Sequence, residues 1–189
     1  MKKLTLERIN TMRMRTLTMA KKKIQLSQET KEQIEKLKEE YLKETDLLDR
    51  YFDEDSKLTP EEMANFNPYE AAQRQNDAVL RMFDLYYTGN LADRTIGKRM
   101  GRIRMFLIYS NKTQSYLPGA LCEDNFSDYY GNWYGFHVMN SSVQSARSSI
   151  AAMKNLMDMF VDLELMKAED RDDIEKLIKS EQTFWLMSM

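Results

Sequence analysis

Arginine and lysine side chains recur at helical spacing between residues 93 and 112, DRTIGKRMGRIRMFLIYSNK. Arg94, Lys98 and Arg102 are four residues apart, so at about 100° per residue they share one side of a helix. Arg99 lies beside them. Cations placed in this way suit the binding of phosphate groups, because Coulomb attraction and counterion release both favour it. The segment therefore predicts a phosphate-binding surface, and the alternative is an ordinary solvated face.

The same segment carries an apolar stripe and two glycines. The stripe recurs at three- and four-residue steps on the side opposite the cations, and it consists of Ile96, Met100, Ile103 and Leu107. Such a stripe is typical of a helix that packs against a core. Gly97 and Gly101 leave a flat strip where a backbone or a sugar-phosphate chain could approach closely.

Few other residues are of the types and spacings that catalysis or metal binding requires. His137 is the only histidine, which excludes a metal site with several histidine ligands, and its aromatic neighbours favour a packed or hydrogen-bonded core position. Cys122 is the only cysteine, so an intramolecular disulfide is excluded. There is no glycine-rich phosphate loop, and the carboxylates sit in charge runs where nothing would raise a pKa. We expect no enzymatic activity, no cofactor and no metal.

The net charge of −2 conceals alternating basic and acidic segments. Residues 1–23 hold eight basic residues and one acidic, residues 24–70 six and fourteen, residues 71–115 eight and three, and residues 116–189 six and twelve. Such a chain does not coat nucleic acid indiscriminately, so a polyanion would bind a local patch. No apolar run reaches the roughly 18 residues of a membrane span and no secretory segment is present, so we expect a cytoplasmic protein without membrane contact.

The 6 glycines and 3 prolines are few for a chain of this length, which favours long helices over a sheet. We expect an all-α fold, a helical bundle of about five to six helices. Three parts are expected: a basic N-terminal arm or extension at 1–23, an acidic amphipathic helical segment at 24–68, and the helical bundle at 69–189.

Local signals place several helix ends. Ser27 is expected to cap the acidic helix, and Thr59-Pro60-Glu61-Glu62 is typical of a capping box. Gly89 suits a left-handed C-terminal cap. We expect Asp93 to cap the basic helix, and Asn140 or Ser141 to cap a later long helix. On the basic helix and on the later long helix, the residues predicted to be buried are Ile103, Leu107, Ile150, Met157 and Phe160.

From about Gln73 to Trp185 the order of elements resembles the N-terminal SAM-like, or core-binding, domain of tyrosine recombinases and phage integrases. The strings that carry the resemblance are LADRTIGKRMGRIRMFLIY, SVQSARSSIAAMKNLMDMF and VDLELMKAEDRDDIEKLIKSEQTFWL. In that family a threonine-led basic helix follows a polar turn, and a later long helix precedes a short acidic hairpin. The intervening NFSDYYGNWYGFHVM is similar to an insert in short recombinase-like bacterial proteins that consist of this domain alone.

The resemblance implies a helical bundle that clasps one side of duplex DNA. It assigns phosphate contacts to basic positions of two helices: Arg94, Lys98, Arg99, Arg102, Arg147 and Lys154. The recombinase catalytic domain needs an arginine, a His-x-x-Arg pair and a nucleophilic tyrosine, but His137 is followed three residues on by Asn140. The resemblance therefore implies a DNA-binding module of phage or mobile-element type that lacks the recombinase catalytic residues.

A second function class is compatible with the same composition. A small helical protein-interaction module, such as a phage-encoded inhibitor or a structural subunit, would present the acidic segment 24–68 and methionine-rich surfaces to a protein partner. Salt separates the two hypotheses, because phosphate binding weakens steeply with salt whereas a hydrophobic interface does not. The first prediction is a non-catalytic module that binds duplex DNA, and the alternative is the protein-interaction module.

Overall fold

The computed structural model describes residues 24–53, 58–139 and 141–187, and no strand occurs among them. The predicted basic arm, residues 1–23, lies outside the described residues. The elements are α2 (Gln28–Phe52), α3 (Pro60–Asn65), α4 (Pro68–Tyr87), α5 (Asp93–Lys112), α6 (Glu123–Asp128), a π-helical turn η1 (Tyr129–Trp133), α7 (Tyr134–His137), α8 (Val143–Asp162) and α9 (Ala168–Met187). The all-α prediction is confirmed. The helix count is above five to six because α3, α6 and α7 are short additional helices.

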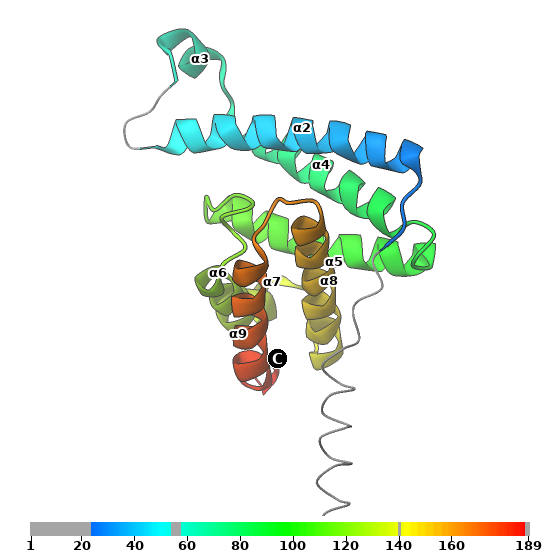
Figure 1. Ribbon diagram of the computed structural model, residues 1–189. Coiled ribbons are helices and arrows are strands. Elements are labelled where there is room, and N and C mark those ends of the chain that lie inside the picture. The colour runs from blue at the N-terminus through cyan, green and yellow to red at the C-terminus, as the bar shows by residue number, and fades with distance from the viewer. Residues whose placement is uncertain (1–23, 54–57, 140, 188–189) are drawn as a thin grey trace, which may run out of the picture.

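The long helices form two antiparallel pairs that are joined by α5 (Figure 1). α2 and α4 run side by side in opposite directions, and α5 lies beneath α4. α8 and α9 form the second pair and extend away from α5, with α6 packed beside α9. α5 therefore packs against α4 on one side and against α8 on the other.

α2 contributes to the main core. Its buried residues Ile34, Leu37 and Tyr41 belong to the same apolar cluster as the inner side of α8, and the ring centroid of Tyr41 lies 5.7 Å from that of Phe160. The amphipathic pattern of the acidic helix is thus satisfied within this chain. The division of the chain at residue 68 stays a prediction, but the described part of 24–68 packs on the bundle.

The predicted core is confirmed. All five residues predicted from the apolar stripes are buried: Ile103, Leu107, Ile150, Met157 and Phe160. Aromatic side chains from η1 extend this core toward α9, since Tyr130 stacks on Trp185 with ring centroids 5.3 Å apart. Tyr129 stacks in the same way on Trp133, at 5.5 Å. Phe106 and Tyr109 of α5 contact the Tyr129 ring with centroids 5.1 and 5.2 Å away, so η1 packs against the side of α5.

The caps predicted at Ser27, Thr59 and Gly89 are confirmed. The caps predicted for the two later helices are wrong by one or two residues. Ser27 accepts a hydrogen bond from the Thr30 amide, Thr59 and Glu62 form the capping box, and Gly89 has a φ of +78°. The Asp93 cap is wrong, because Ala92 occupies the N-cap and Asp93 is the first residue of α5.

Ser142 is the N-cap of α8, so the expected cap at Asn140 or Ser141 is wrong by one or two positions. The Ser142 hydroxyl accepts from the Ser145 amide at 3.2 Å, and the Ser145 hydroxyl accepts from the Ser142 amide at 2.9 Å. This reciprocal pair is a capping box, which a lone serine or asparagine cannot form.

Candidate nucleic-acid interface

The predicted basic row consists of Arg94, Lys98 and Arg102 on α5. Arg94 and Lys98 are exposed, whereas Arg102 is half-buried. The inner side of α5 buries most of the predicted stripe: Ile96, Ile103 and Leu107 are buried and Met100 is half-buried. Arg102 is less exposed than Arg94, and its guanidinium donates a hydrogen bond to the buried Tyr134. The basic row therefore runs from the outer side of α5 toward its α8 edge.

Most described arginines outside α5 are ion-paired, although Arg147 on α8 and exposed lysines of α2 such as Lys36 and Lys43 are not. Four arginines elsewhere have a carboxylate oxygen within 4.0 Å: Arg50, Arg74, Arg81 and Arg171. None of the basic residues of α5 has such a carboxylate within the described structure, and these are Arg94, Lys98, Arg99, Arg102, Arg104 and Lys112. The only acidic residue of α5 is Asp93 in its first turn, so the helix offers these cations no ion pair of its own.

A groove of about 670 Å³ lies between α5 and the start of α8. It is lined by two cations, four polar residues and two glycines: Lys98, Arg102, Ser142, Gln144, Ser145, Ser148, Gly97 and Gly101. No carboxylate lines it. The N-terminus of the 20-residue helix α8 meets this groove, and the helix dipole there favours negative charge. The α5–α8 groove is therefore suited to an anionic group.

Gly97 and Gly101 form an open strip along this groove. A Cβ atom added at either position would meet no atom within 4 Å, so packing within the described structure does not require glycine. Glycine inside a helix costs roughly 0.5–1 kcal/mol relative to alanine. The two glycines thus lower stability without any internal contact that explains them. They allow another molecule to approach the α5 backbone closely.

Tyr134 holds Arg102 at the wall of the groove. Nη1 of Arg102 donates to the Tyr134 hydroxyl at 3.3 Å, and that hydroxyl donates to Oγ of Ser145 at 3.2 Å. The Tyr134 ring is buried. Nearby, the Tyr130 hydroxyl lies 3.1 Å from Oγ of Ser149, and burial raises the pKa of Tyr130 well above its usual value. Tyr130 therefore stays neutral, and Tyr134 fixes the position of Arg102.

Arg99 lies apart from the groove. It is half-buried and close enough to Tyr87 for its charge to affect that phenol. Burial raises the pKa of Tyr87 to about 12, and a hydrogen bond with Asn155 and the charge of Arg99 oppose part of this increase. Arg99 therefore contributes positive charge at the edge of α5 nearest α4.

The second predicted set does not join the basic row. Arg147 is exposed on α8 but does not line the α5–α8 groove. Nζ of Lys154 lies 4.0 Å from a carboxylate oxygen of Glu175 on α9. The structure thus brings together Lys98 and Arg102, with Arg94 on the same helix. Lys154 is instead part of the contact between α8 and α9.

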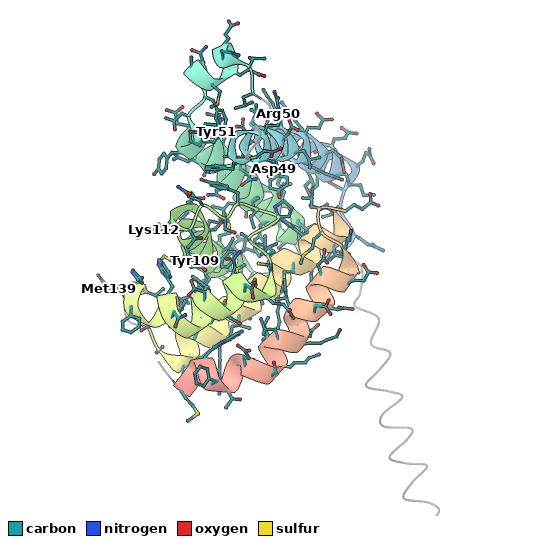
Figure 2. The ribbon with its side chains drawn as sticks, turned by 90° about the vertical axis from the view of Figure 1, so that its left-hand side faces the viewer. Asp49, Arg50, Tyr51, Tyr109, Lys112 and Met139 are labelled. Atoms are coloured by element: carbon teal, nitrogen blue, oxygen red, sulfur yellow. The ribbon has the colours of Figure 1, made fainter. Side chains whose placement is uncertain are left out.

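Two further cations of α5 were not among the predicted site residues. Arg104 is exposed beside a groove of about 340 Å³ between α4 and α5. Lys112 lies at the end of the helix with its Nζ 6.0 Å from the centre of the Trp133 ring (Figure 2). Arg104 follows Gly97 by seven residues, close to two helical turns, and this spacing could have placed it on the outer side of α5 from the sequence.

The residues considered for catalysis or metal binding do not come together in one site. His137 is exposed, so the prediction of a core histidine is wrong; its ring stacks on Trp133 at 4.6 Å and Nδ1 lies 2.9 Å from the Trp133 carbonyl oxygen. Cys122 is half-buried and accepts a hydrogen bond from Asn125 at 3.2 Å. Within the described ranges, no three or more histidine, cysteine, aspartate and glutamate side chains are grouped so as to hold a metal.

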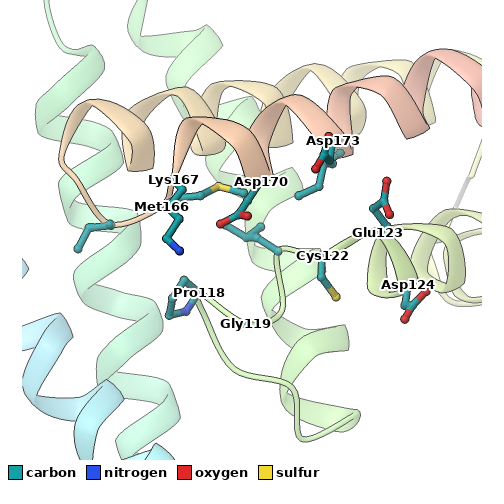
Figure 3. A pocket seen from close by; sticks show the side chains of 12 residues that line it. Pro118, Gly119, Cys122, Glu123, Asp124, Met166, Lys167, Asp170 and Asp173 are labelled. Carbon is teal, nitrogen blue, oxygen red and sulfur yellow. The ribbon is translucent and has the colours of Figure 1, made fainter.

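A cavity of about 620 Å³ lies between the starts of α6 and α9 (Figure 3). Four carboxylates line it and only one cation, Lys167, stands among them; the carboxylates are Glu123, Asp124, Asp170 and Asp173. Repulsion by this excess of negative charge disfavours a phosphate there. The cavity is therefore less suited to an anion than the α5–α8 groove.

The predicted protein contact through residues 24–68 stays a prediction. Part of the acidity of α2 is used internally, because Glu44 accepts two hydrogen bonds from Arg74 at 3.0 Å and Glu40 lies 4.0 Å from Arg81. Across the described helices, none has the length and apolarity needed to cross a bilayer.

Comparisons with family models, curated proteins and solved structures give no match. The resemblance to the core-binding domain of tyrosine recombinases therefore stays a prediction. The argument for function rests on the charges and contacts of α5 and on the groove beside it.

Proposed function

We propose that this protein is a non-catalytic module that binds duplex DNA through its phosphate backbone, with α5 as the contacting helix. The observation that carries the proposal is that six cations lie on one helix, α5, without an ion pair within the described structure, whereas four of the five described arginines on other helices are paired. Cations that make no internal pair keep their full charge for an external anion. Six basic residues on one helix provide several such contacts.

The α5–α8 groove supports the proposal. Lys98 and Arg102 flank it, the N-terminus of α8 meets it, and no carboxylate lines it. Phosphate groups bind at sites of this composition because oriented N–H groups and cations both stabilise negative charge. The glycine strip, Gly97 and Gly101, allows a sugar-phosphate chain to approach the helix. Contacts of this kind fix position on the duplex and carry little sequence information.

The salt dependence of binding gives a quantitative test. Each phosphate that is neutralised contributes about 0.9 to the slope of log affinity against log salt. Three contacts, by Arg94, Lys98 and Arg102, then reduce affinity roughly 40-fold between about 50 and 200 mM salt. Fluorescence anisotropy with two duplexes of unrelated sequence measures this slope directly. Similar slopes and affinities on both duplexes are the expected result.

The variants separate specific contacts from net charge. Arg94→Gln/Lys98→Gln removes the two exposed cations, and adding Arg102→Gln removes the third. We expect the salt slope to fall by about one unit for each lost contact. Lys36→Gln/Lys43→Gln is the matched control, because it removes the same charge from exposed positions of α2. Absence of duplex binding by the unaltered protein at about 50 mM salt, or equal binding by the triple variant, would overturn the proposal.

A further inference from the structure

Two large apolar side chains project from α7 and from the turn that follows it. The exposed fraction is 89% for Phe136 and 88% for Met139, higher than for any other large apolar side chain of the described residues. Figure 2 shows Met139 at the edge of the molecule, on the same side as Lys112. Exposed apolar residues are common and do not by themselves mark a contact surface, and Phe184 and Met187 on α9 are exposed as well. What distinguishes Phe136 and Met139 is the charge of the residues around them. We name Phe136 and Met139 the apolar tip.

The backbone that carries the apolar tip is held by buried neighbours. Tyr134 and Val138, on either side of Phe136, are both buried. The Ser141 hydroxyl donates to the carbonyl oxygen of Gly135 at 3.1 Å, which closes the turn after α7. The exposure of Phe136 is therefore a consequence of the position of α7 on the core.

Two cations of α5 contact the residues that immediately precede the apolar tip. Two residues before Phe136, the Tyr134 hydroxyl accepts a hydrogen bond from Arg102 at 3.3 Å. Three residues before it, the Trp133 ring lies under Lys112, with 6.0 Å between Nζ and the ring centre. No acidic residue occurs between positions 129 and 146. A partner that covers the tip must therefore combine apolar surface with negative charge.

A base step of duplex DNA has this combination, because flat apolar bases lie between two phosphate backbones. Proteins kink DNA by inserting side chains such as Phe and Met between adjacent base pairs while cations hold the phosphates on either side. A protein partner would cover apolar surface without phosphates, whereas a phospholipid surface combines apolar chains with phosphates as a base step does. The base step is favoured over both because the proposed phosphate contacts of α5 are with duplex DNA.

We infer that the apolar tip inserts between adjacent base pairs of the bound duplex and kinks it there. The inference rests on the proposed phosphate contacts of α5 and narrows the partner to DNA that unstacks easily. Pyrimidine–purine steps such as TA are flexible, whereas A-tracts are stiff. The protein then prefers deformable sites without reading base edges.

The experiment compares two duplexes of equal length and base composition. One has a central TA step with 2-aminopurine beside it, and the other has an A-tract with 2-aminopurine at the same distance from the ends. Both carry a donor and an acceptor dye at opposite ends. On binding, insertion raises 2-aminopurine fluorescence because the base is unstacked, and it shortens the distance between the dyes because the duplex bends. Anisotropy over a salt series measures affinity in parallel.

Phe136→Ala/Met139→Ala should lose the fluorescence increase and the bend on the TA duplex. Loss of stacking by one side chain reduces affinity roughly ten-fold or more, whereas the salt slope should stay the same because the cations remain. Phe184→Ala/Met187→Ala is the matched control, since these α9 side chains are 70% and 83% exposed. The control variant should behave as the unaltered protein.

Salt-dependent binding without unstacking or bending would overturn the insertion and leave the proposed function standing. The same holds if the tip variant keeps both signals, or if the control variant loses them equally. Self-association that is removed by the tip variant, with straight bound DNA, would assign the tip to a protein contact and overturn the inference. No binding to either duplex at about 50 mM salt would overturn the proposed function and the insertion together.

Discussion

The hydroxyl of Tyr134 lies 3.3 Å from Nη1 of Arg102 and thereby ties α7 to the wall of the α5–α8 groove. The same hydroxyl donates to Oγ of Ser145 at 3.2 Å, so it makes one bond as acceptor and one as donor. The guanidinium is consequently held in place before any anion arrives. A held cation loses less conformational freedom on binding than a long side chain that is free in solvent.

Tyr134→Phe removes both hydrogen bonds and keeps the buried ring. We expect the free energy of unfolding to fall by about 1–2 kcal/mol, because a hydrogen bond contributes about 0.5–1.5 kcal/mol. Duplex affinity should fall less than with Arg102→Gln, since the charge remains. Urea unfolding and anisotropy measure the two effects. Tyr69→Phe is the control, because this side chain is 70% exposed; equal stability of Tyr134→Phe and the unaltered protein would contradict the prediction.

Ile103→Ala tests the inner side of α5. Ile103 is fully buried, so its truncation should lower the free energy of unfolding by roughly 2–5 kcal/mol. Ile108→Ala provides the comparison on the same helix, because Ile108 is 40% exposed and should cost far less. Chemical denaturation of both variants checks the difference. A change within about half a kcal/mol for Ile103→Ala would show that the site tolerates the cavity.

Periodicity predicted much of the fold because burial on helices repeats at a fixed angle. The stripe through Ile103 and Leu107 and the long-helix stripe through Ile150 and Phe160 are buried as expected. The exact caps were harder to predict, because several polar residues precede each helix. At α8, the choice of Ser142 depends on its reciprocal bonds with Ser145.

The candidate site was predicted only in part from the sequence. Spacing placed Arg94 and Lys98 on one outer surface, but it did not show that Arg102 is half-buried against Tyr134, a residue 32 positions away. It also could not show that Lys154 lies against Glu175, because that contact depends on how α8 and α9 pack. Distances between helices are set by tertiary packing and leave no trace in the period of one helix.

The free energy of unfolding at acidic pH depends in part on Glu175. Burial alone would raise the pKa of this carboxyl, but the charges of Arg171, Lys179 and Lys154 outweigh burial and hold its pKa below the ordinary 4.5. A carboxyl with a lowered pKa in the folded state stabilises the protein above its unfolded pKa, and this contribution is lost as pH falls through the folded value. We therefore expect the free energy of unfolding to decline as the pH falls below about 4.5.

Glu175→Gln should reduce that decline and lower stability at pH 7, where the ion pairs are intact. Urea unfolding between about pH 7 and pH 3 measures the profile, since stability changes with pH wherever the two states bind different numbers of protons. Glu169→Gln removes one carboxylate from the exposed first turn of the same helix and serves as the charge control. Parallel profiles for Glu175→Gln and the unaltered protein would contradict the assignment.

Gly97→Ala and Gly101→Ala separate the stability of α5 from its proposed contact with DNA. Each change should raise the free energy of unfolding by roughly 0.5–1 kcal/mol, because alanine is the better helix former and its Cβ meets no atom within 4 Å. The same methyl groups stand in the strip along which a sugar-phosphate chain would approach, so duplex affinity should fall. Urea unfolding and anisotropy on one preparation measure both.

Ala151→Gly, at an exposed position of α8, is the reciprocal control and should lose stability while keeping affinity. If both glycine variants were more stable and bound duplex unchanged, close approach along the strip would be excluded, and the cations of α5 would have to act without it.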